Sequence, residues 1–101
     1  MTSVFDVVAQ PARRALLDLL IDGPHPVGEL VRASGLSQPN TSRHLRVLRE
    51  AGLVRRRAHG QRRLYELRAC GFIELESWLA PYRTLWQGSL GALERYLEEG
   101  E

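Results

Sequence analysis

The alternation of hydrophobic and polar residues predicts short helices at the start of the chain. Residues 3–9 form one helix with Ser3 as its N-cap, because a hydroxyl placed before an apolar run can accept a hydrogen bond from the first turn. Residues 11–22 form a second helix, since Pro11 favours a first turn and apolar residues recur at three- and four-residue steps. Residues 25–27 then make a short extended connection.

Two further helices meet at a tight turn. Residues 27–34 form the first, which ends at Gly35, a residue type that readily adopts the left-handed conformation of a helix C-terminus. Ser37 is a candidate N-cap for the second, over residues 38–51. Two short helices joined by a glycine-containing turn are typical of a helix-turn-helix, whose second helix is the recognition helix.

The residue pattern then changes to one that favours strands. Residues 53–58 and 62–68 flank a short segment with a central glycine, so they predict a β-hairpin in which Tyr65 and Leu67 share one face. The tip of this hairpin is basic, which favours a wing beside the recognition helix over a buried central pair of strands.

The last third of the chain is again helical. Apolar residues recur at three- and four-residue steps over about 71–99, and Pro81 marks a break or a restart of the helix. A chain of 101 residues has room for about one domain, so we expect a single, mainly α-helical winged helix-turn-helix over residues 1–101. Its parts are the helix-turn-helix at about 27–52, the wing at about 53–68 and the helical tail.

Composition narrows the cellular setting. A single cysteine, Cys70, excludes an intramolecular disulfide and fits a reducing compartment, and a redox role for it lacks a second cysteine that could resolve it. The sequence contains no apolar stretch of the length that a signal peptide or a membrane span needs. It therefore predicts a cytoplasmic protein that does not bind a membrane.

The net charge of +2 is unevenly distributed. All fourteen basic residues are arginine, and residues 43–68 hold nine of them against two glutamates, a net charge of +7. Residues 1–42 carry a net charge of −1 and residues 69–101 a net charge of −4. A local basic block of this kind binds a polyanion, most often nucleic acid, although a solvated charged face is the alternative.

The recognition helix has two chemically different sides. Thr41, Leu45 and Leu48 cluster on one side, which marks it as the core side, and His44 lies beside them. The candidate DNA-contacting residues of this segment are Ser37, Gln38, Pro39, Asn40, Ser42, Arg43, His44, Arg46 and Arg49.

The side chains of this set are those that bind DNA. Arginine pairs with guanine, and glutamine or asparagine with adenine, in the major groove. Alternatives stay open for several of them: Gln38 and Asn40 could cap or solvate the helix start, Arg43 and Arg46 could bind phosphate, and His44 could be structural or face a phosphate. The wing adds candidates for the phosphates or the minor groove, namely Arg55, Arg57, Arg62 and Arg63.

Residues 35–54 read GLSQPNTSRHLRVLREAGLV, and this run resembles the ArsR family of winged helix-turn-helix repressors, whose pattern is close to GLSQxxxSxHLxxLxxAGLV. The resemblance extends to the wing motif Gly60-Gln61-Arg62 with Tyr65 and so covers most of the chain. It implies a cytoplasmic homodimer that represses transcription from a palindromic operator of double-stranded DNA until a signal releases it. The sequence leaves the small-molecule or protein effector unidentified.

The metal sites of that family are missing from the sequence. Its metal-sensing members carry a thiolate motif before the third helix, and the two cysteine positions fall here on Pro26 and Gly28. A second family site needs aspartate and histidine in the C-terminal helix, yet no histidine follows His59. We therefore expect no metal and no cofactor.

In the family, the first and last helices form the dimer interface, so the resemblance implies an interface built from the apolar residues of both. The candidates are Val4, Phe5, Val8, Trp78, Tyr82, Leu85, Trp86, Leu90, Leu93 and Leu97. The alternative is that Trp78 and Trp86 cover the chain's own core.

The pattern as a whole predicts a sequence-specific transcriptional regulator, most simply a homodimeric repressor. The alternative is a winged-helix module for protein interaction whose basic face does not read DNA. An enzyme is not expected, because no nucleophile, base and orienting residue can be assembled from the dispersed polar positions.

Overall fold

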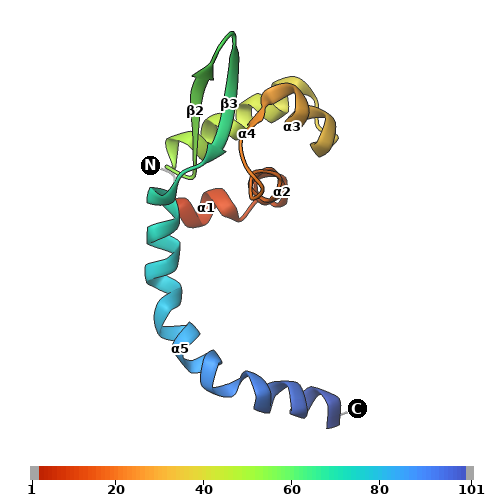
Figure 1. The fold of residues 1–101 in the computed structure, drawn as a ribbon. Coiled ribbons are helices and arrows are strands. Elements are labelled where there is room, and N and C mark those ends of the chain that lie inside the picture. The colour runs from red at the N-terminus through yellow and green to blue at the C-terminus, as the bar shows by residue number, and fades with distance from the viewer. Residues whose placement is uncertain (1–2, 100–101) are drawn as a thin grey trace.

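The computed structural model describes residues 3–99, and within them all side chains except those of residues 87–96 and 99. Figure 1 shows a helical domain, a hairpin that projects from it and a long final helix that leaves it in the other direction. In chain order the elements are α1 (Val4–Val8), α2 (Pro11–Leu19), β1 (His25–Pro26), α3 (Val27–Ser34), α4 (Gln38–Glu50), β2 (Val54–His59), β3 (Arg62–Leu67) and α5 (Ala69–Glu99).

Local capping sets the helix boundaries, as the sequence predicts. The Ser3 side chain accepts from the backbone N–H of Asp6 at the start of α1. At the start of α4, the Ser37 hydroxyl oxygen accepts from the backbone N–H of Asn40 at 3.2 Å. Gly35 ends α3 with a φ of 74°, so the chain turns sharply and enters α4 after two more residues.

The segment expected to be only an extended connection is a strand. His25 pairs with Tyr65 and Pro26 with Leu64, so the sheet has the antiparallel order β1-β3-β2. Pro26 is tolerated because β1 is an edge strand, where a missing backbone N–H costs no ladder bond on the outer side. The predicted hairpin wing is confirmed, and the strand β1 adds to it: β3 is central and ties the wing to the start of α3.

The core lies between α1, α2, α3, α4 and the base of the wing. Its fully buried side chains come from elements far apart in the sequence: Val7, Leu16, Leu20, Leu30, Thr41, Leu45, Leu48, Leu53 and Val54. Because α4 contributes three of these side chains, its inner side packs firmly against the rest of the domain. Its outer side is left for solvent.

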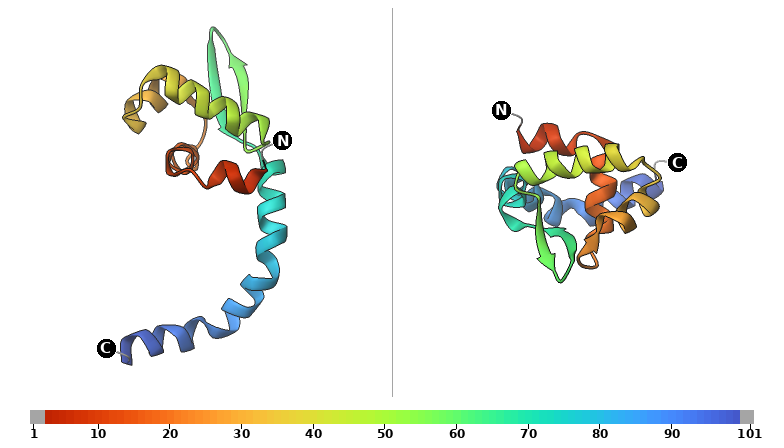
Figure 2. Two further views of the ribbon diagram at one scale, coloured as in Figure 1. Left: turned by 180° about the vertical axis from the view of Figure 1, so that it is seen from behind. Right: turned by 90° about the horizontal axis from the view of Figure 1, so that it is seen from above.

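The final helix differs from the expectation at two points. It begins at Ala69 rather than near residue 71, and it continues through Pro81 to Glu99 without a break. Proline removes one backbone hydrogen bond and bends a helix, but the turns on either side can stay helical. Figures 1 and 2 accordingly show α5 curving along its length away from the domain.

The second helix is shorter than expected and ends at Leu19 rather than near residue 22. Within the part of the chain that the structure describes, no helix has the length and apolar character needed to cross a membrane.

Candidate nucleic-acid interface

The outer side of α4 carries the polar residues that the sequence analysis selected. We call this exposed set the recognition face, and its members are Gln38, Pro39, Asn40, Ser42, Arg43 and Arg46. The inner side consists of Thr41, Leu45 and Leu48, all with an exposed fraction of 0%. The sequence-based division of this helix into two sides is confirmed, because burial follows the 100° spacing of its residues.

Ser37 and Thr41 are committed to the structure of the helix start. The Ser37 side chain caps Asn40, and the Thr41 hydroxyl donates to the Ser37 carbonyl oxygen at 2.9 Å. These bonds set the direction in which the first turn of α4 leaves the domain. Pro39 has no backbone N–H and that of Asn40 is bonded to Ser37, so the backbone N–H of Gln38 is the group of this turn that can bind a phosphate.

The arginines of α4 are in three different situations. Arg43 is exposed and, among the side chains described, makes no ion pair. The Nε of Arg46 donates to Glu50 Oε1 at 3.2 Å, one helical turn further on. Arg49 is half-buried. Arg43 therefore has the most freedom to reach a base.

His44 lies on the inner side, not on the recognition face. It is 8% exposed, and its Nδ1 accepts from the Nε of Arg13 on α2 at 3.3 Å. Burial lowers the pKa of His44 below its ordinary value, and the charges of Arg13 and Arg43 add to this. Of the two roles the sequence left open, this geometry favours the structural one: a neutral His44 joins α4 to α2.

The register of the wing divides its arginines between two faces. Arg55 stands opposite Glu66 and Arg57 opposite Leu64, whereas Arg56 stands opposite the buried Tyr65. Arg56 and Arg63 thus belong to the side of the sheet that packs on the core, and Arg55, Arg57 and Arg62 to the other.

Arg56 is a basic residue of this surface that the sequence analysis did not select. It is exposed, and it shares a side with Val54, whose side chain is fully buried. The signal that could have found it is the strand period of two, counted outward from Val54 and Tyr65.

Two wing arginines share one acidic partner. The Nε of Arg55 donates to Glu66 Oε1 at 2.7 Å, and the Nε of Arg57 donates to the same oxygen at 2.9 Å. These bonds, the one from Arg55 first, hold the pKa of Glu66 below its ordinary value. Sequence reasoning missed this carboxylate, which only the cross-strand register brings beside both arginines.

The apolar residues of the predicted dimer interface fall into two groups. Phe5 on α1 meets Trp78 on α5 edge to face with ring centroids 5.8 Å apart, and Trp78 lies 5.3 Å from Tyr82. Trp78 is 56% exposed and Trp86 49%, so they do not complete the chain's own core. Exposed apolar side chains continue along the helix at Leu85 and Leu97.

Val4 corrects that prediction, because it points into the chain's own core and is only 4% exposed. Val8 is half-buried and packs against the same core. Leu90 and Leu93 lie outside the side chains that the structure describes. The exposed part of the predicted interface is therefore Phe5 with the outward side of α5.

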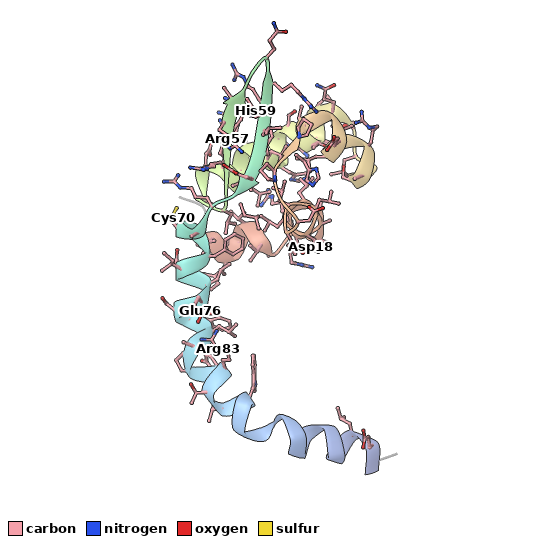
Figure 3. All side chains as sticks on the ribbon, viewed as in Figure 1. Asp18, Arg57, His59, Cys70, Glu76 and Arg83 are labelled. Carbon is pink, nitrogen blue, oxygen red and sulfur yellow. The ribbon has the colours of Figure 1, made fainter. Side chains whose placement is uncertain are left out.

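The junction between wing and tail holds Cys70. Its Sγ donates to the carbonyl oxygen of Gly52 at 3.3 Å. Figure 3 shows Cys70 at the top of α5, with Glu76 and Arg83 further along the same helix. Among the residues that the structure describes, no three histidine, cysteine, aspartate or glutamate side chains are placed to hold a metal ion together.

These features define a class of protein: a winged helix-turn-helix DNA-binding regulator, with a basic recognition helix, a basic wing and an apolar helical tail. Comparison of the sequence with known proteins identifies the family. The family model described as "Bacterial regulatory protein, arsR family" matches residues 10–56. The chain is 40% identical to the HTH-type transcriptional regulator Rv2034 of Mycobacterium tuberculosis, over 79% of this chain and 75% of the relative. The chain belongs to the ArsR family.

Two further similar proteins are a named repressor and a homodimeric DNA-binding domain. The transcriptional repressor SdpR of Bacillus subtilis is 30% identical over 78% of this chain and 88% of the repressor. The homodimeric winged helix-turn-helix DNA-binding domain of Mb0332 from Mycobacterium bovis, solved by NMR in solution, is 27% identical with a TM-score of 0.62. That likeness covers 81% of this chain and 73% of the domain.

Proposed function

We propose that this protein is a homodimeric transcriptional repressor that binds a palindromic DNA operator with its recognition helices and wings. The observation that carries the proposal is α4 itself: its inner side is buried, while its outer side presents polar and basic side chains to solvent. Its likeness to a named repressor and to a homodimeric DNA-binding domain supports the proposal. The function is one of binding, without catalysis, and it acts on DNA in the bacterial cytoplasm.

The recognition face would read bases, and the flanking groups would hold phosphates. We assign base contacts to Gln38, Ser42, Arg43 and Arg46, because these side chains are exposed and carry major-groove donors. We assign phosphate contacts to the start of α4, through the backbone N–H of Gln38 and the exposed side chain of Asn40, which Ser37 and Pro39 flank, and also to Arg49 and to the wing.

Two-fold symmetry of the dimer determines the form of the operator. Paired recognition helices need two half-sites related by the same axis, about 34 to 36 Å apart or a multiple of that distance along the duplex. The −4 charge of residues 69–101 keeps the tail away from phosphates, whereas the +7 block of residues 43–68 faces them. A single subunit would therefore contact only one half-site.

Salt dependence of binding tests this function. The protein should retard the duplex that it selects from a randomised library, and its affinity should fall by about 10³- to 10⁵-fold between 50 and 200 mM salt if six to ten phosphates are contacted. Equal affinity at the two salt concentrations would contradict the electrostatic account. Failure to select any duplex would favour a winged-helix module for protein interaction instead.

A further inference from the structure

The wing carries a carboxylate in the middle of its basic surface. Glu66 lies directly across the hairpin from Arg55, and one oxygen, Oε1, accepts from both Arg55 and Arg57. The Glu66 side chain is 17% exposed, whereas those of Arg55 and Arg57 are 60% and 42% exposed. The acid thus lies beneath two guanidinium groups that stay at the surface.

The bonding pattern leaves the outer ends of both arginines available. Each arginine donates through Nε, the nitrogen nearest its own backbone, and the structure gives no bond from their terminal nitrogens. A guanidinium held at Nε can still offer its two terminal nitrogens to a phosphate. Glu66 therefore restricts where Arg55 and Arg57 point without occupying the nitrogens that would meet DNA.

The charge of Glu66 works against indiscriminate DNA binding. A carboxylate on a DNA-facing surface repels phosphates and removes one net positive charge from the basic block. Its low pKa keeps it ionised at neutral pH. A wing selected only for tight binding to any duplex gains no affinity from this group, and its position between two arginines favours a role in orientation or discrimination.

We propose that Glu66 is a specificity-determining positioning residue of the wing: it holds Arg55 and Arg57 in one arrangement that fits the operator backbone and penalises other DNA. This inference rests on the proposed DNA-binding function. Loss of the carboxylate charge weakens the hold on the two guanidinium groups, which then bind phosphates of any sequence more readily. The affinity for non-specific DNA rises, and the preference for the operator falls.

The Glu66→Gln variant tests this with two probes: the duplex that the wild-type protein selects from a randomised library, and a scrambled duplex of the same composition. We expect tighter binding to the scrambled duplex and a ratio of the two affinities lower by about two- to fivefold, the range that single exposed charge contacts produce. Glu76→Gln is the matched control. It removes the same charge and weakens the ion pair with Arg83 on α5, away from the wing (Figure 3).

The control separates local positioning from net charge. Glu76→Gln should change both affinities by the same small factor and leave their ratio unchanged. If Glu66→Gln also leaves the ratio unchanged while wild-type protein still selects an operator, the inference is wrong and the proposed function stands. If wild-type protein selects no duplex, the proposed function itself is wrong.

Two further measurements distinguish a positioning role of Glu66 from an effect on folding. Thermal unfolding of Glu66→Gln establishes that the variant is folded at the assay temperature. In a background that carries Arg55→Gln and Arg57→Gln, the further change Glu66→Gln should no longer alter the affinity ratio, because the carboxylate has nothing left to position. An unchanged effect of Glu66→Gln in that background would overturn the proposal.

Discussion

At the scale of single residues, two histidines near the helix-turn-helix have neighbours that shift their protonation in opposite directions. The ring of His25 lies between Asp22 Oδ1, 2.9 Å from Nε2, and Glu29 Oε2, 2.8 Å from Nδ1. The hydrogen bond to Asp22, then that to Glu29, raises the pKa of His25. Burial, with help from nearby arginine charges, lowers the pKa of His44.

Stability should therefore depend on pH in a different way at each histidine. A raised folded-state pKa stabilises the fold below the ordinary value of 6.5 and loses this effect as pH rises above it, so the melting-temperature advantage of wild type over His25→Gln should shrink from pH 6.5 to 8.5. For His44 the sign reverses. The advantage of wild type over His44→Gln should shrink as pH falls below 6.5, because the unfolded chain then binds the extra proton.

Melting curves of the three proteins between pH 5 and 8.5 provide the measurement. Asp22 and Glu29, which bond His25, and Arg13 and Arg43, whose charges act on His44, are unchanged in all three proteins. A shift of the two variants in the same direction across this range would contradict the assignment of opposite signs.

Arg43 is the residue best placed to distinguish base reading from phosphate binding. Arg43→Ala should cost about 1 to 3 kcal/mol of operator affinity and relax the preference at one base pair. Arg83→Ala, which removes the same charge from α5, should have little effect. Binding to a library of operator variants measures both, and a uniform loss across all sequences would assign Arg43 to phosphate.

At the scale of elements, the joint between α4 and α5 depends on a close backbone approach. The N–H of Gly71 donates to the carbonyl oxygen of Gly52 at 2.8 Å. A Cβ at residue 71 would lie 2.7 Å from the carbonyl oxygen of Ala51 and 2.8 Å from the carbonyl carbon of Gly52. These are backbone atoms of the recognition-helix terminus, so they cannot move aside without moving that helix.

Gly71→Ala should therefore destabilise the protein by about 1 to 3 kcal/mol, the usual effect of overpacking, although alanine favours helix. Gly28→Ala is the matched control, since a Cβ there meets only the end of the Arg32 side chain at 3.6 Å. That change should be neutral or stabilise by up to about 1 kcal/mol. Denaturant unfolding compares them, and equal effects would contradict the importance of the close approach.

Three helix boundaries follow from a local rule, whereas the end of α2 and the start of α5 differ from the prediction. The caps at Ser3 and Ser37 and the turn at Gly35 act within a few residues, and the structure confirms all three. Pro81 was harder to interpret, because the same residue can end a helix or only bend it. Packing and the turns on both sides decide between these outcomes, and the proline residue alone does not determine either of them.

At the scale of the whole molecule, the tail makes the chain far from compact. The radius of gyration is 17.0 Å, against about 13 Å for a compact domain of this length. The outward side of α5 leaves Trp78, Tyr82, Leu85 and Trp86 between 47% and 67% exposed. Large apolar side chains gathered in this way mark an interaction surface, which fits the homodimer.

Sedimentation tests the dimer directly. The wild-type chain should sediment at about twice its mass of 11.4 kDa at micromolar concentration. Trp86→Glu should shift the mass toward the monomer, because a charge is costly to bury in an apolar interface. Ile21→Glu, at an exposed apolar position on the domain, is the control and should leave the dimer intact. A wild-type mass near 11.4 kDa would contradict the dimer.

The sequence by itself determined the features that depend on residues close to one another along the chain. These are the helix caps, the two sides of α4, the hairpin and the concentration of arginine in residues 43–68. Each follows from spacing along the chain, through the helix period of 3.6 or the strand period of 2. The same spacing placed the recognition face, and hence most of the candidate DNA surface.

Only the tertiary structure decided which distant residues meet. It paired β1 with β3, turned Val4 into the core, joined His44 to Arg13 and placed Glu66 beneath Arg55 and Arg57. These contacts depend on strand register and on the angles at which helices pack, which no local pattern records. The basic block was therefore evident from the sequence, whereas its division into restrained and unrestrained arginines required the fold.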